Sequence, residues 1–178
     1  VYKRQILNID SNGDSTDAHF AIAHGAATSS STELLRVQED GKVLINSTTS
    51  SGVGRQLQIN ATSAYSYSGI SLGRFANDTS NSGLDFVKSR SATVGGSTIV
   101  QSGDSIGAII FKCADGNDLL TPAAEIRADV DGTPGANDMP GRIRFSTTAD
   151  GSSSLTELAR MTSTRNLLLS QTAVEDWD

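Results

Sequence analysis

The chain has 178 residues, a formal net charge of −6 and 17 glycines, and only 5% of its residues are aromatic. A chain of this length can bury roughly 70% of its unfolded surface, which is enough for a full domain. The acidic balance, without any cluster of Lys and Arg, argues against a nucleic-acid groove, and no run approaches the roughly 18 apolar residues of a membrane span. We therefore expect no nucleic-acid partner and no membrane insertion.

The first five residues, Val-Tyr-Lys-Arg-Gln, can be encoded by the end of a transposon adapter used in DNA library preparation. We therefore expect residues 1–5 to be an adapter-derived artefact and the gene to come from a metagenomic read. They are left out of the fold prediction.

Residue patterns in the first half of the chain predict several short strands. Residues 19–23 predict a short strand with Phe20 and Ile22 on one face. The Asp-Gly pair inside 32–49 predicts a β-hairpin, because Asp-Gly between two β-rich runs is a strong turn signal. Residues 49–54 have the composition of a linker. Further short strands are predicted in residues 55–60, 63–75 and 83–91.

The central stretch, residues 106–150, carries the clearest alternation. Residues 107–112 are apolar at nearly every position and predict a strand covered on both sides. Residues 124–131 and 142–145 alternate between apolar and charged side chains, which predicts two strands with a buried apolar face and a wet charged face. The Gly and Pro residues of 132–141 predict a turn between them.

An internal repeat connects the two ends of the chain. Residues 156–172 align without a gap on residues 32–48, at an offset of 124 positions. Either each copy closes one structural unit, or the match reflects chance or two similar hairpins. The predicted division is residues 6–48 as the tail of an upstream β module, 49–54 as a linker, 55–172 as a β-sandwich-like module closed by the second hairpin, and 173–178 as a C-terminal tail.

The predicted fold class is all-β, a β-sandwich or jelly-roll-like module flanked by β-hairpins. Helical period is absent, and the short strands are separated by Gly, Asn, Asp and Ser turns. A two-stranded ribbon is marginal alone, and its edges invite pairing with another chain. We therefore expect an oligomer, with the strands interwoven in a trimer as one form it can take.

Two stretches, STIVQSGDSIGAIIFKCADG and DGTPGANDMPGRIRFSTTADG, resemble repeat modules of tail-fibre and receptor-binding structural proteins of tailed bacteriophages, especially marine ones. The resemblance covers residues 32–172 and implies a virion appendage, commonly trimeric, that presents surfaces to a host receptor. One departure is Ser163 to Asn166, where the family usually has an Asp-Gly or Ser-Gly turn. Such fibres often continue into a self-cleaving chaperone domain, and nothing after Thr172 resembles one.

Candidate catalytic residues are aspartates of the central stretch: Asp115, Asp118, Asp129, Asp131 and Asp138. A glycosidase would need one of them in an apolar pocket with a raised pKa. Most of them neighbour Gly or Asn, which is typical of wet turns. We therefore expect no catalysis, although a fragment of a polysaccharide-degrading tailspike stays open as an alternative.

The sequence has no strong signal for a metal, thiol or sugar site. The aspartates do not match a twelve-residue calcium loop, and His19 and His24 lack partners at zinc spacing, so neither a metal nor a cofactor is expected. Cys113, next to an apolar strand, is expected to be a buried inert thiol. Tyr65 and Tyr67 share a strand face, and they predict packing more strongly than stacking on a sugar ring.

The resulting functional prediction is a non-catalytic structural and host-adhesion module of a phage tail fibre. The expected partners are two further copies of the chain in a homotrimer, other tail-fibre or baseplate proteins, and a glycan or protein receptor on the host surface. The expected location is the virion tail, extracellular after lysis. A non-viral secreted sugar-binding adhesin module is the second alternative.

Overall fold

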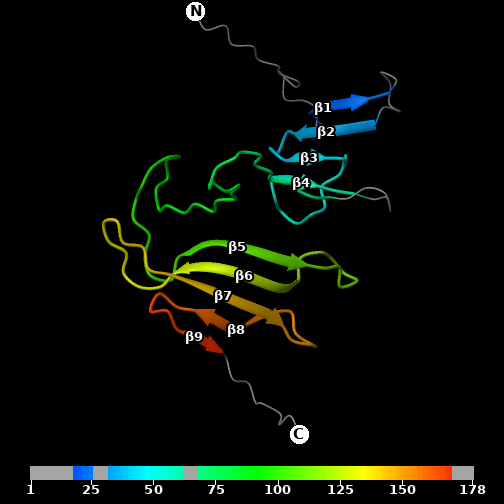
Figure 1. Cartoon of the computed structure of the whole chain (residues 1–178). Coiled ribbons are helices and arrows are strands. Elements are labelled where there is room, and N and C mark those ends of the chain that lie inside the picture. The colour runs from blue at the N-terminus through cyan, green and yellow to red at the C-terminus, as the bar shows by residue number, and fades with distance from the viewer. Residues whose placement is uncertain (1–17, 26–31, 62–67, 170–178) are drawn as a thin grey trace, which may run out of the picture. The chain divides into compact units, whose positions relative to one another are not determined.

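The structure, a computed structural model, describes residues 18–25, 32–61 and 68–169. Contacts divide the chain into residues 1–77 and 78–178, and each unit contains one sheet (Figure 1). The described residues form strands and no helix, which confirms the predicted all-β class. In these ranges, accordingly, no helix is long and apolar enough to cross a membrane.

The first sheet has four strands in the order β1-β2-β3-β4. Their bounds are β1 (His19–His24), β2 (Thr32–Gln38), β3 (Val43–Ile45) and β4 (Leu57–Ile59). The β2–β3 hairpin confirms the prediction for residues 32–49, and Gly41 occupies its turn with a φ of 82°, a conformation that glycine adopts without strain. β4 pairs with β3 in parallel. Residues 49–54, which were predicted to be a linker, lie between β3 and β4 of this sheet.

The second sheet is an antiparallel meander of five strands in the order β5-β6-β7-β8-β9 (Figure 1). Their bounds are β5 (Ser105–Lys112), β6 (Pro122–Val130), β7 (Gly141–Thr148), β8 (Leu155–Met161) and β9 (Leu167–Leu169). The strands predicted at 107–112, 124–131 and 142–145 are thus confirmed. Alternation locates them well because the period of two is a local property of each strand.

Two predicted strands are wrong. Residues 68–75 and 83–91, the described parts of those segments, belong to no strand. From residue 68 to 89 the backbone makes no hydrogen bond to the backbone of any other described residue. The apolar alternation is present, as in Ile70 and Leu72, but a strand needs a partner, and the described part of the chain provides none.

Burial in the second sheet differs from the prediction, although Val130 of the apolar face is buried as expected. On the charged face, Glu125 is 4% exposed and Asp129 is 2% exposed, whereas Ile143 on the apolar face is 44% exposed. Arginine side chains lie against the carboxylates of the charged face and cover them, and the long apolar stems of arginine suit this role. β5 was predicted to be covered on both sides, but Ile109 and Phe111 are about half exposed.

Candidate self-association surface

The apolar face of the second sheet is the main candidate site. Cross-strand register places Ile109 opposite Ile126, Ile126 opposite Phe145, and Ile143 opposite Met161. The face consists of large apolar side chains, each at least 36% exposed: Ile109, Phe111, Ile126, Ile143, Phe145, Met161, Leu167 and Leu169. None of them is charged. A contiguous apolar surface of this kind marks an interaction site.

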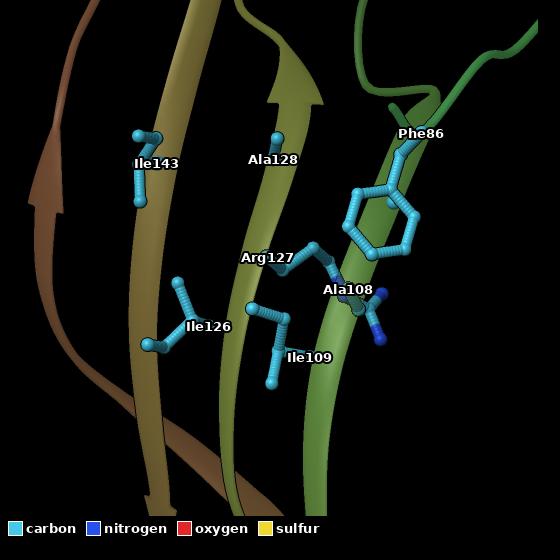
Figure 2. A pocket seen from close by; sticks show the side chains of 8 residues that line it. Phe86, Ala108, Ile109, Ile126, Arg127, Ala128 and Ile143 are labelled. Atoms are coloured by element: carbon cyan, nitrogen blue, oxygen red, sulfur yellow. The ribbon is translucent and has the colours of Figure 1, made fainter. Parts of the chain in front are cut away.

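Phe86 covers one end of this apolar face (Figure 2). A Cβ atom at Gly107 would lie 2.5 Å from the Cβ of Phe86, so only glycine at this point of β5 lets Phe86 approach so closely. Beside Phe86, Ile109, Ile126 and Ile143 line a hollow of about 140 Å³. A dry cavity of about 150 Å³ can hold a benzene ring, so the hollow has the size of one apolar side chain.

The charged face of the second sheet is held by its own ion pairs. Arg144 Nε donates to Asp129 Oδ2 at 2.5 Å, and its Nη1 donates to Glu157 Oε2 at 3.3 Å. Arg160 also donates to Glu157, and these two guanidinium groups lower the pKa of the Glu157 carboxyl. Charge-assisted hydrogen bonds of this kind are the stronger ones in proteins. The charged face therefore carries its own counter-ions, and the apolar face has no comparable cover.

Asp131 joins the start of the β6–β7 connection to the β8–β9 turn. Its Oδ2 accepts hydrogen bonds from the backbone N–H of Ser163 at 2.9 Å and from the Ser163 hydroxyl at 3.0 Å, and its Oδ1 accepts from Arg142 Nη1 at 3.0 Å. These bonds lower the pKa of Asp131, with the Ser163 N–H as the largest cause. Both turns are thereby fixed to the same end of the sheet.

The first sheet repeats this arrangement. Apolar residues of its four strands share one face: Phe20, Ile22, Leu35, Val37, Val43, Ile45, Leu57 and Ile59. Phe20, Ile22 and Leu57 are the exposed members. On the opposite face Arg36, Leu44 and Gln58 are buried, and Arg36 Nε donates to Glu33 Oε2 at 2.7 Å. In this sheet too, residues of the polar face are buried and apolar side chains of the other face are exposed.

The described residues contain very little core. Only three apolar side chains are buried, Leu44, Val100 and Val130, whereas 25 large apolar side chains are exposed. Ordering a chain costs roughly 1–2 kcal/mol per residue in backbone entropy, and apolar burial is the main term that offsets it. Three buried side chains cannot supply that burial. Each sheet, taken by itself, therefore needs a further surface to cover its apolar face.

The aspartates considered for catalysis have structural partners. Asp115 Oδ1 accepts from the backbone N–H groups of Asn117 and Asp118, and its Oδ2 accepts from the Thr121 hydroxyl. These bonds lower the pKa of Asp115, the opposite of what a general acid needs. Asp118 caps the next turn by accepting from the N–H of Leu120, and Asp138 lies exposed in the β6–β7 connection.

The two histidines and the cysteine considered as candidate ligands lie within the described residues. His19 Nε2 lies 3.7 Å from Glu33 Oε1, and His24 is exposed at the end of β1. Within the described ranges no three His, Cys, Asp or Glu side chains could hold a metal ion together. Cys113 is exposed, so the prediction of a buried thiol is wrong: β5 ends at Lys112 and the cysteine follows it. Tyr65 and Tyr67 lie outside the described residues.

Sequence reasoning missed the contact between Phe86 and Gly107, although a signal for it existed. A glycine inside an otherwise apolar strand often marks a close approach of another segment. Gly107 stands at this position in β5, between Ile106 and Ala108. Which segment approaches it could not be read from the sequence.

No protein-family model matches the chain, and no curated protein matches it. The fold is similar to that of the carboxy-terminal domain of the L-shaped tail fibre of bacteriophage T5, with a TM-score of 0.62 and 14% sequence identity over 93% of this chain and 70% of that one. A structure of the same domain with its intra-molecular chaperone domain gives the same score and identity, and the match spans 48% of that longer chain. At this identity the likeness shows a similar fold.

Proposed function

We propose that the chain is a non-catalytic structural and host-adhesion module of a phage tail fibre, which assembles as a homotrimer through the apolar face of its second sheet. The observation that carries the proposal is this open apolar face, in a structure whose described residues bury only three apolar side chains. The fold likeness to a tail-fibre domain supports the same role.

Further copies of the chain are the partners that suit this face best. The face has no charged side chain, so bringing identical faces together creates no like-charge repulsion. A partner surface that the chain needs in order to fold must be available whenever the chain is synthesised. Other copies of the chain are always available at that moment. Most soluble oligomers are homo-oligomers with closed symmetry, in which each copy contributes the same surface. Interfaces that are obligate in this way are the more apolar ones.

Adhesion in this proposal belongs to the loops and the charged face, which stay accessible when the apolar face is covered. Loops held by a rigid scaffold are the usual place for receptor contacts. The β6–β7 connection has such a base, because Asp131 is bound to Ser163 and Arg142. Its tip is closed by the paired backbones of Gly135 and Asp138. A host surface glycan or protein is the proposed ligand, and other tail-fibre or baseplate proteins are the proposed neighbours in the virion.

Two neighbouring leucines of β9 provide the test of assembly. Leu169 lies on the apolar face and is 68% exposed, and Leu168 lies on the charged face and is 50% exposed. We expect Leu169→Glu to dissociate the trimer, because it buries a carboxylate without a partner, and Leu168→Glu to leave it intact. Light scattering of the full chain over a dilution series measures both. Equal behaviour of the two variants would refute an interface on the apolar face.

The adhesion part has its own test. Fluorescently labelled full chain should sediment with cells from a panel of bacterial isolates, and the dissociated Leu169→Glu variant should bind more weakly because trimerisation multiplies weak contacts. If the intact trimer binds to none of the isolates, the adhesion part of the proposal is refuted and only the structural role remains.

A further inference from the structure

The sequence contains four Asp-Gly pairs, at positions 40–41, 115–116, 131–132 and 150–151. Each lies in the connection between two consecutive strands of one sheet. Asp-Gly is a dipeptide prone to form isoaspartate, because glycine has no side chain to shield its amide nitrogen from the neighbouring carboxyl group. The four pairs share this local chemistry, so a difference in their reactivity comes from the fold.

The reaction begins when the backbone nitrogen of the glycine attacks Cγ of the aspartate. A C–N bond forms, the C–O bond of the protonated carboxyl group breaks, and the hydroxyl leaves with the amide proton as water. Water then opens the succinimide ring. Attack at Cγ restores aspartate, whereas attack at the main-chain carbonyl carbon gives isoaspartate, in which the main chain runs through Cβ and Cγ. One water is lost and one is regained, so no oxidant or reductant takes part.

Two of the pairs are protected because hydrogen bonds hold the carboxylate. Asp115 Oδ1 accepts from the backbone N–H of Asp118 at 3.0 Å. Asp131 accepts from the backbone N–H of Ser163 at 2.9 Å and from Arg142 Nη1 at 3.0 Å. These N–H groups of Asp118 and Ser163 are the largest causes of the lowered pKa of the two carboxyl groups. Such a carboxyl group must break its bonds and take up a proton before it can react.

The pair at 40–41 is protected on both of its reacting groups. Asp40 forms an ion pair with the Lys42 ammonium group, and its Oδ1 accepts from the Lys42 backbone N–H at 3.1 Å. The ammonium group is the largest cause of the lowered pKa of Asp40. The Gly41 N–H, whose nitrogen is the nucleophile, donates to the Gln38 carbonyl oxygen at 3.0 Å. Neither group is free to move toward the other.

The pair at 150–151 has none of these restraints. Asp150 and Gly151 are exposed in the middle of the β7–β8 turn, which the N–H of Ser152 closes by donating to the Ala149 carbonyl oxygen at 3.1 Å. Within the described ranges, no hydrogen bond or ion pair holds the Asp150 carboxylate, and no group accepts from the Gly151 N–H. A Cβ atom at Gly151 would meet nothing within 4 Å, so the turn also has open space around it.

We propose that Asp150 and Gly151 form the isoaspartate site of this chain among its four Asp-Gly pairs, with water as the co-reactant. The inference is independent of the proposed function. Isoaspartate adds one carbon atom to the main chain inside the turn, so the bond from Ser152 to Ala149, which spans it, is lost. The bond from Ser163 to Asp131 lies at the opposite end of β7 and is kept. An aged chain therefore carries two forms of the β7–β8 turn.

The test ages the full chain near neutral pH and body temperature and then digests it with trypsin. Cleavage after Lys and Arg places the four pairs in four different peptides, 37–42, 113–127, 128–142 and 145–160. Isoaspartyl and aspartyl forms of a peptide have equal mass, separate in reversed-phase chromatography and are identified by electron-transfer dissociation. We expect isoaspartate in peptide 145–160 to accumulate at least about tenfold faster than in the other three, whose reacting groups must first break hydrogen bonds.

Two controls separate the fold from the local sequence. In urea the four pairs should react within about threefold of one another, because the unfolded chain protects none of them. Asp150→Glu keeps the charge but disfavours ring closure, so peptide 145–160 should no longer gain a second form. Equal accumulation at the four pairs of the folded chain, faster accumulation at another pair, or a second form that persists in Asp150→Glu would each overturn the inference.

Hydrogen exchange measures the change in the turn. In the aged chain the Ser152 amide should exchange several-fold faster, because its acceptor is displaced, while the Ser163 amide should exchange at its original rate. Unchanged exchange at Ser152 in a chain that has accumulated isoaspartate would refute the loss of the turn bond.

Discussion

Gly107→Ala is expected to destabilise the chain through a single contact. The added methyl group would lie 2.5 Å from the Cβ and 2.6 Å from the Cγ of Phe86, closer than real carbon atoms approach. Either Phe86 leaves the apolar face or β5 shifts, and overpacking of this kind costs about 1–3 kcal/mol. Alanine also lowers the conformational entropy of the unfolded chain, which stabilises the folded state by about 0.4–1 kcal/mol. The net expected loss is about 1–2 kcal/mol.

Removing the whole side chain at position 86 should cancel this loss, since alanine there would keep the Cβ atom that the added methyl group meets. In a Phe86→Gly background the methyl group at position 107 meets neither the Cβ atom nor the ring, so Gly107→Ala should be neutral or slightly stabilising there. Urea unfolding of the four chains, at one protein concentration because association contributes to stability, measures the coupling. We expect a coupling free energy of about 2 kcal/mol. An equal penalty for Gly107→Ala in both backgrounds would refute the packing of Phe86 on β5.

Three further predictions concern the turns and ion pairs. Because Arg160 lowers the pKa of Glu157 in the folded chain, the ion pair stabilises the fold at pH values above the unfolded pKa of 4.5. This stabilisation is lost as the pH falls through the lower pKa of the folded state. Glu157→Gln should therefore reduce the acid dependence of the urea midpoint between pH 6 and 3. Arg165→Gly should raise the free energy of unfolding, measured in urea, by about 0.5–1 kcal/mol, because it relieves the positive φ. Gly41→Ala should lower the free energy of unfolding by about 1 kcal/mol. Asp131→Asn should speed hydrogen exchange of the Ser163 amide several-fold, because the amide loses its charged acceptor, and an unchanged rate would contradict the bond.

Local signals predicted the strands and turns well. The Asp-Gly pair at Asp40 and Gly41 predicts the β2–β3 hairpin because the turn chemistry lies within four residues. The alternation around Ile126 and Ile143 predicts β6 and β7, including which side chains share a face. The 124-residue offset between the two copies of the repeat predicts the shared register of β2–β3 and β8–β9, since the same pattern folds in the same way.

Burial and non-local pairing could not be predicted in the same way. A period of two shows which side chains share a face and not what covers that face, so Ile126 and Asp129 were assigned the wrong exposure. The parallel pairing of β3 with β4 depends on a connection whose path has no local signal. Residues 83–91 have strand-like alternation, but an alternating segment becomes a strand only where a partner edge lies beside it.

The solution mass of the full chain, measured by light scattering during stepwise dilution, tests the central claim most directly. Covered apolar faces predict a particle of three times 18.6 kDa that dissociates only on strong dilution and loses β structure as it does so. A particle of 18.6 kDa at micromolar concentration, with its β-sheet circular dichroism intact, would contradict the claim, because a single chain would then be stable without a partner copy.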